Sequence, residues 1–383
     1  MRKALVLVLS NLKHDARVTR QVNFLSKEFE VTLAAFGSGT SACNHFIPIV
    51  QHPLSLMRKV GIAIWSLLGR YDQSWQTFHP YRTLEQSLAG TDWDLIVAND
   101  ADTLPMAFRI RRSEKTRVVF DAHEYAPRHF ENSLIWRLIF QPLNIWICST
   151  FIPKTAALFT VGQGLADEYE KHFGKKPVIM TNAPGYRALR PSETSESKIR
   201  LVHHGIANPA RRLDLLYDLM QLLDNRFTLD LYLVTSDYAS TGTRNYIADL
   251  KAKLESDARI HVWPPVPGHQ VVDTLHAYDA GIFLLPPINF NYANTLPNKF
   301  FDFIQARLAV IVGPSPEMAA LVNRYDLGIV GTSYDPVGLA PLLNGLTAGK
   351  LTYYKQQSAL AARELSAEQN EQVFMTVIRS LYS

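Results

Sequence analysis

Short apolar runs alternate with helical periodicity along almost the whole chain. The runs have the length and continuous apolar character of strands that are buried on both faces of a sheet. Between them lie segments whose apolar residues recur every three or four positions, such as 18–28 and 213–223. Because strands that alternate with helices pair in parallel, the pattern predicts an α/β protein with parallel sheets. The strand candidates are residues 4–9, 31–35, 95–98, 118–120, 157–161, 178–180, 201–204, 229–234, 260–263, 281–285, 309–312 and 328–330.

The chain has 383 residues, which is more than one compact core usually holds. A polar stretch with two prolines interrupts the alternation near its middle, and such a stretch is typical of a linker. We therefore expect two doubly wound, Rossmann-like domains. The N-terminal domain is expected to cover 1–185, the linker 186–198 and the C-terminal domain 199–366, followed by a helix over 367–383.

Two segments depart from the alternation. Residues 54–68 are apolar with Arg58 and Lys59 near one end, and residues 134–152 are more apolar still. Polar residues and Pro142 within the second segment argue against a spanning helix, which needs about 20 nearly uninterrupted apolar residues. Both segments are therefore either core-packing helices or helices that lie on a membrane surface.

Charge is spread unevenly although the formal net charge is only +4. Residues 1–190 carry 23 Lys and Arg against 16 Asp and Glu, and the remainder carries 16 against 19. A basic first half suggests an anionic partner, such as a phospholipid or a lipid phosphate. The basic residues are dispersed and form no stripes, so nucleic acid is not expected as a partner.

The cysteine content and the N-terminus bear on the compartment. Cys43 and Cys148 provide neither a disulfide framework nor a metal cluster, which favours a reducing environment. The opening apolar run is too short for a signal peptide and has the character of a buried strand. We therefore expect a cytoplasmic protein, with peripheral contact to the inner face of the plasma membrane if either apolar segment lies on lipid.

Residues 294–313 show the most informative local pattern, a loop followed by a short helix and a buried strand. Pro297 suits the first helical turn, where its missing N–H costs nothing. Lys299 and Asp302 are polar residues at the start of an otherwise apolar helix. A helix N-terminus with a cation beside it attracts phosphate, and an acid nearby can hold a sugar hydroxyl. The segment therefore suggests a nucleotide-sugar site.

Polar residues also follow the strands of the first half, where ligands of open α/β sheets bind. After the first strand, Asp15 is placed to cap a helix, and Arg17 would face solvent or the ligand cleft. After the strand 95–98, Asp100 and Asp102 form a D-x-D pair that can hold a divalent metal. Asp102 also stands at a helix start, so a capping role is the alternative.

Three ionisable residues, Asp121, His123 and Glu124, cluster at the end of the strand 118–120. Histidine can donate to a sugar hydroxyl or to a developing negative charge without a full charge of its own. The alternative is a structural histidine that is satisfied by Asp121. We favour a functional role because polar clusters at this edge of a sheet face the ligand.

A glycine-led loop follows the strand 201–204 and leads from Gly205 to Arg211. A guanidinium at this place offers a fork to a diphosphate. The sequence contains neither a P-loop nor a G-x-G-x-x-G dinucleotide fingerprint, and it lacks the G-x-S-x-G elbow and the H-E-x-x-H zinc motif. These absences disfavour a P-loop nucleoside triphosphatase, a Rossmann dinucleotide-binding protein, an α/β-hydrolase and a zinc metalloprotease of the H-E-x-x-H type.

Taken together, these segments resemble the retaining glycosyltransferases of the GT-B fold, family 4. The likeness covers nearly the whole chain and rests on five motifs in the family's order. They are DARVTRQVNFLSKEFEVTLAAF, FDAHEY, FTVGQGLADEY with VIMTNAP, HHGIANPARRLDLL, and LPNKFFDFIQARLAVIVGPSPEM. The resemblance implies two Rossmann-like domains that face a cleft, with the C-terminal helix crossing back to the N-terminal domain.

The resemblance also implies roles for single residues. Asp302 matches the acid that holds the ribose hydroxyls, Arg211 matches the phosphate-binding lysine, and His123 matches the histidine that contacts the donor sugar. Val266 lies where the family holds the base through backbone groups. We also expect Gly205 and Leu296 on the donor side, Glu124 beside His123 among the catalytic residues, and Asp15, Arg17 and Asp100 on the acceptor side. Three positions depart from the family: Asn294 replaces an acid, Ile206 an arginine and Arg307 a glycine. We expect Lys299 to supply the missing cation.

The implied activity is transfer of a hexose from a nucleotide diphosphate sugar, with UDP-glucose or another UDP-hexose expected as the donor. The expected acceptor is a saccharide or a lipid-linked molecule in polysaccharide or glycolipid synthesis. Such enzymes require no metal and no cofactor besides the donor. Alternatives are a metal-dependent transferase that uses Asp100 and Asp102, a sugar-nucleotide 2-epimerase of the same fold, and a non-catalytic sugar-binding subunit.

Overall fold

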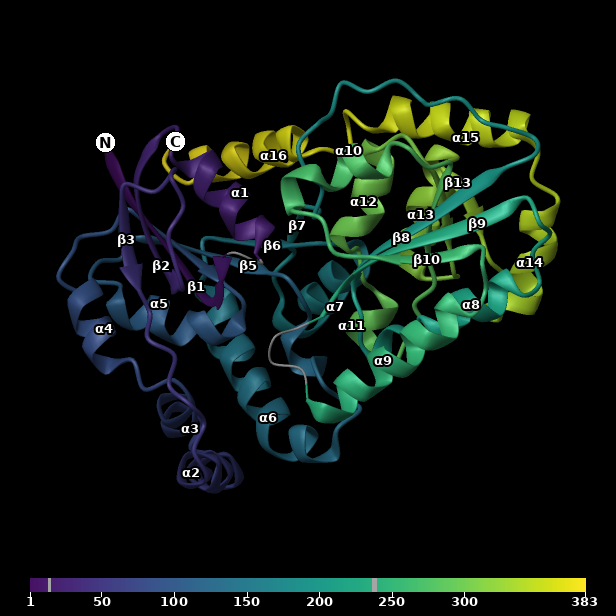
Figure 1. Cartoon of the computed structure of the whole chain (residues 1–383). Helices are drawn as coiled ribbons and strands as arrows, with labels where there is room; N and C mark the ends of the chain where they lie inside the picture. The colour runs from purple at the N-terminus through teal and green to yellow at the C-terminus, as the bar shows by residue number, and fades with distance from the viewer. Residues whose placement is uncertain (13–14, 236–239) are drawn as a thin grey trace. The chain divides into compact units, whose positions relative to one another are not determined.

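A computed structural model describes residues 1–12, 15–235 and 240–383 of the chain (Figure 1). The chain divides into two compact units. Unit 1 comprises Met1–Thr181, Asn289–Asn291 and Glu371–Ser383, and unit 2 comprises Asn182–Ile288 and Tyr292–Asn370. Residues 182–198 contain no helix or strand, so the passage from one sheet to the other is an extended segment.

Unit 1 is built on a seven-stranded sheet with the order β3-β2-β1-β4-β5-β6-β7, in which every described pair is parallel. Six of these strands lie where the apolar runs predict them. The exception is β3, a short edge strand whose residues are exposed or half-buried and which ends in proline. The strands are β1 (Arg2–Asn11), β2 (Phe29–Phe36), β3 (His45–Pro48), β4 (Leu95–Asn99), β5 (Arg117–Ala122), β6 (Ala157–Thr160) and β7 (Val178–Ile179).

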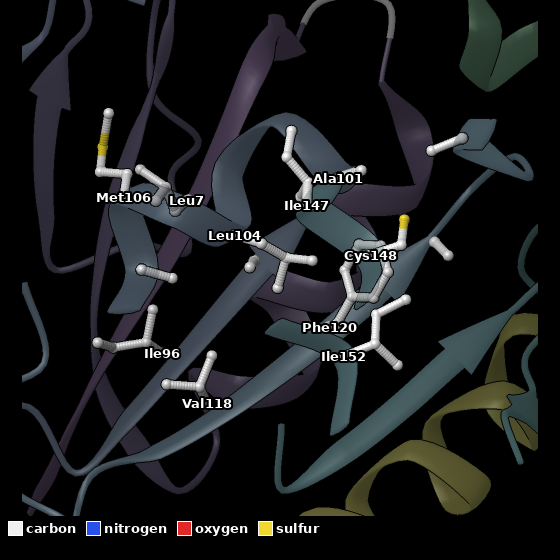
Figure 2. Close-up of a cluster of buried hydrophobic side chains, with 14 of the residues drawn as sticks. Leu7, Ile96, Ala101, Leu104, Met106, Val118, Phe120, Ile147, Cys148 and Ile152 are labelled. Atoms are coloured by element: carbon white, nitrogen blue, oxygen red, sulfur yellow. The ribbon is translucent and has the colours of Figure 1, made fainter. Parts of the chain in front are cut away.

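The strand residues on both faces of this sheet are buried, because helices cover both faces. In β4 and β5, Ile96 and Phe120 face the cluster drawn in Figure 2, where they meet Leu104 and Ile147 from two helices. Each such side chain contributes about 1.5–3 kcal/mol when it is removed from water. The helices of unit 1 are α1 (Ala16–Leu25), α2 (Leu56–Leu67), α3 (Tyr71–Phe78), α4 (Arg82–Leu88), α5 (Leu104–Ile110), α6 (Leu134–Phe151) and α7 (Gln163–Phe173).

Unit 2 is built on a six-stranded parallel sheet with the order β10-β9-β8-β11-β12-β13, and all of its strands were predicted. From β8 the strands β9 and β10 follow one another on one side, and β11, β12 and β13 follow on the other side, so the strand order switches between β8 and β11. Doubly wound sheets bind ligands at such a switch point. The strands are β8 (Ile199–Ile206), β9 (Phe227–Val234), β10 (Ile260–Trp263), β11 (Ala280–Phe283), β12 (Ala309–Val312) and β13 (Gly328–Val330). The helices are α8 (Asp214–Met220), α9 (Thr241–Glu255), α10 (Val271–Leu275), α12 (Asn298–Gln305), α13 (Pro316–Tyr325), α14 (Pro336–Asn344) and α15 (Ala348–Ala361). The first two residues of the short helix α11 (Phe290–Ala293) belong to unit 1 and the last two to unit 2.

The position of α12 on the sheet is fixed by a glycine. A Cβ atom added to Gly281 in β11 would lie 2.2 Å from the ring of Phe303, so only glycine admits the ring. Phe303 is fully buried, and its neighbours Phe300 and Phe301 fill the same core. The helix therefore packs directly on β11, with its N-terminus beginning after Pro297.

The last helix, α16 (Ala367–Ser380), reaches unit 1 through its second half. Its Phe374 packs between Phe24 and Phe159, with ring centroids 6.3 and 5.0 Å away. The hydroxyl group of Tyr382 donates to the carbonyl of Asp94 over 2.9 Å. The helix thus packs on the N-terminal Rossmann-like unit, as the predicted fold class requires.

Arg307 occupies a backbone conformation that normally selects glycine, with φ of 63°. Its side chain is buried, and the guanidinium donates to the carbonyls of Ile304 at 3.1 Å and Gln305 at 2.9 Å. It also donates to the carbonyls of Leu189 and Arg187 in the extended segment before β8. The strain of this backbone conformation is therefore offset by hydrogen bonds that hold this segment against α12.

Replacement of Arg307 separates these two effects. We expect Arg307→Ala to lower the free energy of unfolding more than Arg307→Gly does, by about 1 kcal/mol, because alanine keeps the left-handed strain that glycine relieves. Both variants lose the guanidinium bonds, so both should be less stable than the parent protein. Urea denaturation measures the difference, and equal stabilities of the two variants would show that the backbone conformation relaxes.

Candidate functional site

Four of the predicted donor-side residues of unit 2, Gly205, Arg211, Lys299 and Asp302, lie where β8 ends and α12 begins. Gly205, the penultimate residue of β8, has φ of 125°, a value that L side chains rarely adopt. A Cβ atom added there would lie 2.8 Å from Lys299 Nζ. Gly205 therefore leaves space for the lysine, and the structure brings these two predicted residues together.

Lys299 is buried, with 8% of its surface exposed. Its Nζ lies 3.4 Å from His203 Nε2 and 4.2 Å from the centroid of the Phe283 ring. Burial lowers the pKa of Lys299 well below its ordinary value, nearby Arg211 lowers it further, and Asp302 offsets part of the fall. Within the described part of the chain, no carboxylate forms an ion pair with Lys299.

His203 is the neutral partner of this lysine. Burial lowers the pKa of His203 well below its ordinary value, and Lys299 lowers it further. In the neutral ring Nδ1 carries the proton, which it donates to the carbonyl of Ile282 over 2.9 Å, so that Nε2 can accept from Lys299. His203 was not predicted as a site residue, although His203 and His204 form a polar pair at the end of an apolar strand, a pattern that could have indicated it.

Arg211 follows β8 through a 3-10 turn, Pro209–Arg211, whose first backbone N–H groups are partly capped by Asn208. The amide oxygen of Asn208 accepts from the backbone N–H of Arg211 at 3.1 Å. The guanidinium lies over the ring of Tyr292, with 5.2 Å between its carbon and the ring centroid. Its Nε is buried and has no hydrogen-bond partner among the residues that the structure describes.

Lys299 and Arg211 therefore lie close enough to influence each other at the ligand end of this sheet, and neither forms an ion pair with a carboxylate of the described residues. Such an arrangement is costly, because each side chain loses water without gaining an ion-pair partner. A bound diphosphate would supply that partner, together with acceptors for the unsatisfied N–H groups of Arg211. The electrostatics of Lys299 and Arg211 are those of an anion-binding site.

Asp302 lies about one helical turn after Lys299 in α12 and faces His204 on β8. His204 Nε2 and Asp302 Oδ2 are 3.3 Å apart, and both side chains are 13% exposed. The ring of His204 also packs edge-on against Phe303. The predicted ribose ligand thus lies next to His204, which was not predicted as a site residue.

The other donor-side predictions have different surroundings. The side chain of Leu296 is buried in the core, and its carbonyl accepts from the amide of Asn182 at 3.1 Å. Leu296 therefore contributes to packing, and only its backbone is suited to a ligand. Asn294 is half-buried between α11 and α12, and Val266 is half-buried in the loop after β10.

In unit 1, Asp121 at the end of β5 is fully buried and is held by Arg17 of α1. The guanidinium donates to both carboxylate oxygens, at 2.9 and 2.6 Å, and Gln21 donates at 3.1 Å. Burial alone would raise the pKa of Asp121, but Arg17 and His123 hold it well below its usual range. Arg17 was expected to face solvent or the cleft. It points inward instead, because only a cation balances the buried carboxylate.

His123 lies between two carboxylates. Its Nδ1 is 3.5 Å from Asp100 Oδ2, and its Nε2 is 3.5 Å from Asp121 Oδ2. Burial by itself would lower the pKa of His123, but Asp100 and Asp121 raise it to about 9. The imidazole is therefore protonated at neutral pH, in contrast to the uncharged donor expected from the sequence.

Asp100 holds this histidine through a strained backbone. Its φ is 63°, a value that is uncommon for a residue other than glycine. Its backbone N–H donates to the carbonyl of Asp121 at 3.0 Å, and its Oδ1 accepts from the backbone N–H of His123 at 3.3 Å. Residues in such conformations persist where the surroundings overdetermine them, and they concentrate at functional sites.

The other predicted acids of unit 1 have structural partners. Asp15 caps α1 as one reading of the sequence proposed, accepting from the backbone N–H of Val18 at 3.1 Å. Asp102 does not cap α5, whose N-cap is Thr103, and its Oδ2 lies 3.7 Å from His79 Nε2.

Glu124 is the most exposed of these acids. Its Oε2 lies 2.8 Å from His129 Nε2, and both side chains are close to half exposed. The carbonyl of Glu124 accepts from the hydroxyl of Tyr169 at 2.8 Å. The backbone at this position is therefore fixed, while the carboxylate is shared with a surface histidine.

A set of metal ligands and a surface concavity are two further features that could mark a binding site. Among the described residues, no group of three His, Cys, Asp or Glu side chains is arranged to hold a metal ion. A concavity of about 620 Å³ in unit 2 is lined by residues of α8 and α14 and contains neither Lys299 nor Arg211. Charge and unsatisfied donors, and not the shape of a pocket, identify the anion site.

Comparison with known proteins identifies the fold. No family model matches the sequence, and no curated protein sequence matches it. Among solved structures, HepE of Anabaena in complex with UDP and glucose is 14% identical with a TM-score of 0.68, and 99% of this chain and 100% of that chain are covered. A UDP-forming α,α-trehalose-phosphate synthase of Burkholderia xenovorans is 10% identical with a TM-score of 0.72, and both chains are fully covered. Sucrose-phosphate synthase of Thermosynechococcus elongatus is 12% identical with a TM-score of 0.70, and 100% of this chain and 99% of that chain are covered.

These likenesses extend over the whole chain at low identity, so they establish the fold. Together with the two parallel sheets, they confirm the predicted α/β fold class, the GT-B arrangement of two Rossmann-like domains.

Proposed function

We propose that this protein is a glycosyltransferase that moves a hexose from a UDP-sugar to a saccharide or lipid-linked acceptor. The observation that carries the proposal is the pair of basic residues Lys299 and Arg211 at the ligand end of the second sheet, neither of which forms an ion pair with a carboxylate of the described residues. A sugar nucleotide supplies an anionic partner in its diphosphate. The fold is shared with proteins solved with UDP or described as UDP-forming, which supports uridine as the base.

The donor site is assigned to unit 2. Lys299 and Arg211 hold the diphosphate, and the N-terminus of α12 adds its dipole. Asp302, positioned by His204, accepts from the ribose hydroxyls. Backbone groups near Val266 hold the base, as the family resemblance implies, and the backbone of Leu296 and the amide of Asn294 complete the donor side.

The chemistry proposed for unit 1 centres on His123. The resemblance to retaining family 4 enzymes places the corresponding histidine at the transferred sugar. A protonated His123 donates a hydrogen bond to a sugar hydroxyl or stabilises negative charge that develops there, while Asp121 and Asp100 fix its orientation. The bond between the anomeric carbon and the phosphate oxygen breaks, and the acceptor hydroxyl oxygen forms a new bond to that carbon. The acceptor hydroxyl gives its proton to the leaving diphosphate, which Lys299 and Arg211 stabilise.

Metal is not assigned a role in this proposal. The two cations and the helix N-terminus provide the positive charge that a divalent ion supplies in D-x-D transferases. Asp100, which a metal would need, is committed to His123. We therefore propose that the enzyme is metal-independent.

The proposal is tested by titrating the purified protein with UDP, GDP and ADP in a calorimeter, followed by turnover assays with UDP-hexoses. We expect UDP to bind most tightly and UDP to be released from a UDP-hexose when an acceptor is present. Conversion of the UDP-sugar into its epimer without acceptor would replace the proposal by an epimerase. Tight binding without any turnover across an acceptor panel would indicate a sugar-binding subunit, and absence of UDP binding would exclude the donor site.

A further inference from the structure

The helix α2 in unit 1 has a narrow buried stripe and, on its other side, an exposed apolar face. Its buried residues are Ile62 and Ser66, which form one narrow stripe. On the other side, large apolar side chains are exposed to solvent, among them Met57 at 86% and Leu67 at 71%. At 100° per residue these exposed residues fall within an arc of about 120°, roughly opposite the buried stripe. They are Leu56, Met57, Val60, Ile64, Leu67 and Leu68.

The helix α6, which packs against α2, shows the same division. Leu143, Ile147 and Cys148 face the core that Figure 2 shows. Leu134, Ile135, Leu138 and Ile145 are exposed and lie within an arc of about 100°. In Figure 1, α2, α3 and one end of α6 form the lower edge of unit 1. We call the exposed apolar residues of the two helices the α2–α6 face.

By length and composition, residues Leu134–Lys154 also pass as a candidate membrane span. The structure argues for a different position. Ile147 and Ile152 belong to the core over β4 and β5, so inserting this helix across a bilayer would dismantle unit 1. Pro142 lies within the helix, which further disfavours a span. The sequence analysis left core packing and membrane contact as alternatives for this segment, and α6 has a face suited to each.

The charges around the α2–α6 face have one sign. Residues 54–70 and 134–154 contain no Asp or Glu, and their basic residues are Arg58, Lys59, Arg70, Arg137 and Lys154. Lys59, Arg70 and Arg137 are exposed. The nearest acids in sequence are already paired, Asp72 with Arg109 and Glu131 with Arg128. An apolar surface bordered by cations is complementary to the interface of an anionic bilayer.

We propose that the α2–α6 face docks on an anionic phospholipid bilayer, with α2 and the first turns of α6 lying in the interface and Lys59, Arg70 and Arg137 contacting lipid phosphates. A second copy of the chain is disfavoured as the occupant, because a two-fold contact would place these cations opposite one another. Large exposed apolar patches mark interaction sites in soluble proteins. The inference rests on unit 1 alone and does not depend on the proposed donor site.

The test is flotation of the full chain with vesicles of equimolar phosphatidylglycerol and phosphatidylcholine, compared with vesicles of phosphatidylcholine alone. We expect the protein to float with the anionic vesicles and to bind the neutral ones at least tenfold more weakly, with binding weakened by salt. The double variant Met57→Glu/Leu67→Glu should bind anionic vesicles more than tenfold more weakly, because each substitution puts a carboxylate where an apolar side chain enters the lipid. Both positions are highly exposed, so the fold should be retained, and circular dichroism checks this.

The matched control is Val337→Glu/Leu360→Glu, which adds the same charge at residues of α14 and α15 that are 65% and 75% exposed. This control should float like the parent protein. Equal loss in both double variants would reduce the effect to overall charge and overturn the proposal, as would flotation of the α2 variant at parental levels. Light scattering that shows a dimer which the α2 variant dissociates, together with no flotation of the parent protein, would assign the face to a second copy.

Discussion

Lys299→Met is expected to weaken UDP binding by about one to two orders of magnitude, since a charge-assisted contact is worth about 1.5–3 kcal/mol. Methionine keeps most of the side-chain volume beside Gly205 and removes only the charge. In the unliganded protein Lys299 is buried, and Asp302 offsets only part of the fall in its pKa that burial and Arg211 cause. The same substitution should therefore leave the free energy of unfolding unchanged or raise it. Calorimetric titration with UDP and urea denaturation measure the two effects.

Lys355→Met is the matched control. Lys355 is also a fully buried lysine of unit 2, but its Nζ lies 3.4 Å from Asp279 Oδ1 and donates to Ser192 over 2.7 Å. Removing this paired lysine should lower stability and leave UDP affinity at the parental value. If Lys355→Met weakened UDP binding as strongly as Lys299→Met, the effect at Lys299 would be a general consequence of disturbing the unit.

Proton uptake provides an independent signature of the same site. In the unliganded protein the pKa of Lys299 is lowered, and a diphosphate beside the lysine would raise that pKa again. At a pH between the pKa of the unliganded protein and that of the UDP complex, UDP binding takes up a proton. UDP affinity should therefore fall as the pH rises through this interval. Calorimetry in buffers of different ionisation enthalpy should detect the uptake for the parent protein and not for Lys299→Met.

Arg211→Ala should also weaken UDP binding by one to two orders of magnitude. The Nε of Arg211 has no hydrogen-bond partner among the described residues and is therefore available to the diphosphate.

His123→Gln is the second change with a large expected effect. We expect the turnover number to fall by about 10²–10⁴-fold, the usual contribution of a positioned proton donor, with UDP affinity unchanged. His129→Gln is the control, because His129 is a neighbouring histidine paired with the exposed Glu124. Turnover should stay near the parental value in the control. Parental turnover in His123→Gln would remove this residue from the mechanism.

The pH profile distinguishes a protonated His123 from a merely structural one. Its pKa is about 9, so it carries a proton at neutral pH and loses it as the pH rises through that value. The turnover number of the parent protein should therefore decline on the alkaline side with an apparent pKa near 9. The residual activity of His123→Gln should lack this limb, and an identical limb in the variant would assign it to another group.

The sequence by itself determined the architecture. Apolar runs bounded by polar residues are a local property of the chain, and burial on both faces of a parallel sheet requires them. Hence the strands of both sheets were predicted except β3, which lies at an edge and needs no continuous apolar run. The same reasoning identified Asp121, His123, Arg211, Lys299 and Asp302, because polar residues that follow buried strands or begin an apolar helix stand out locally.

The tertiary structure decided how these polar groups pair. Arg17 and Asp121 lie 104 positions apart, and only folding shows that one neutralises the other and leaves His123 between two carboxylates. Lys299 could as well have had an acid partner, and its lowered pKa depends on burial next to Arg211. A charge, a pKa and an unsatisfied donor are sums over neighbours in space, which sequence order does not specify, whereas the hydrophobic pattern that builds the two sheets is carried by each segment on its own.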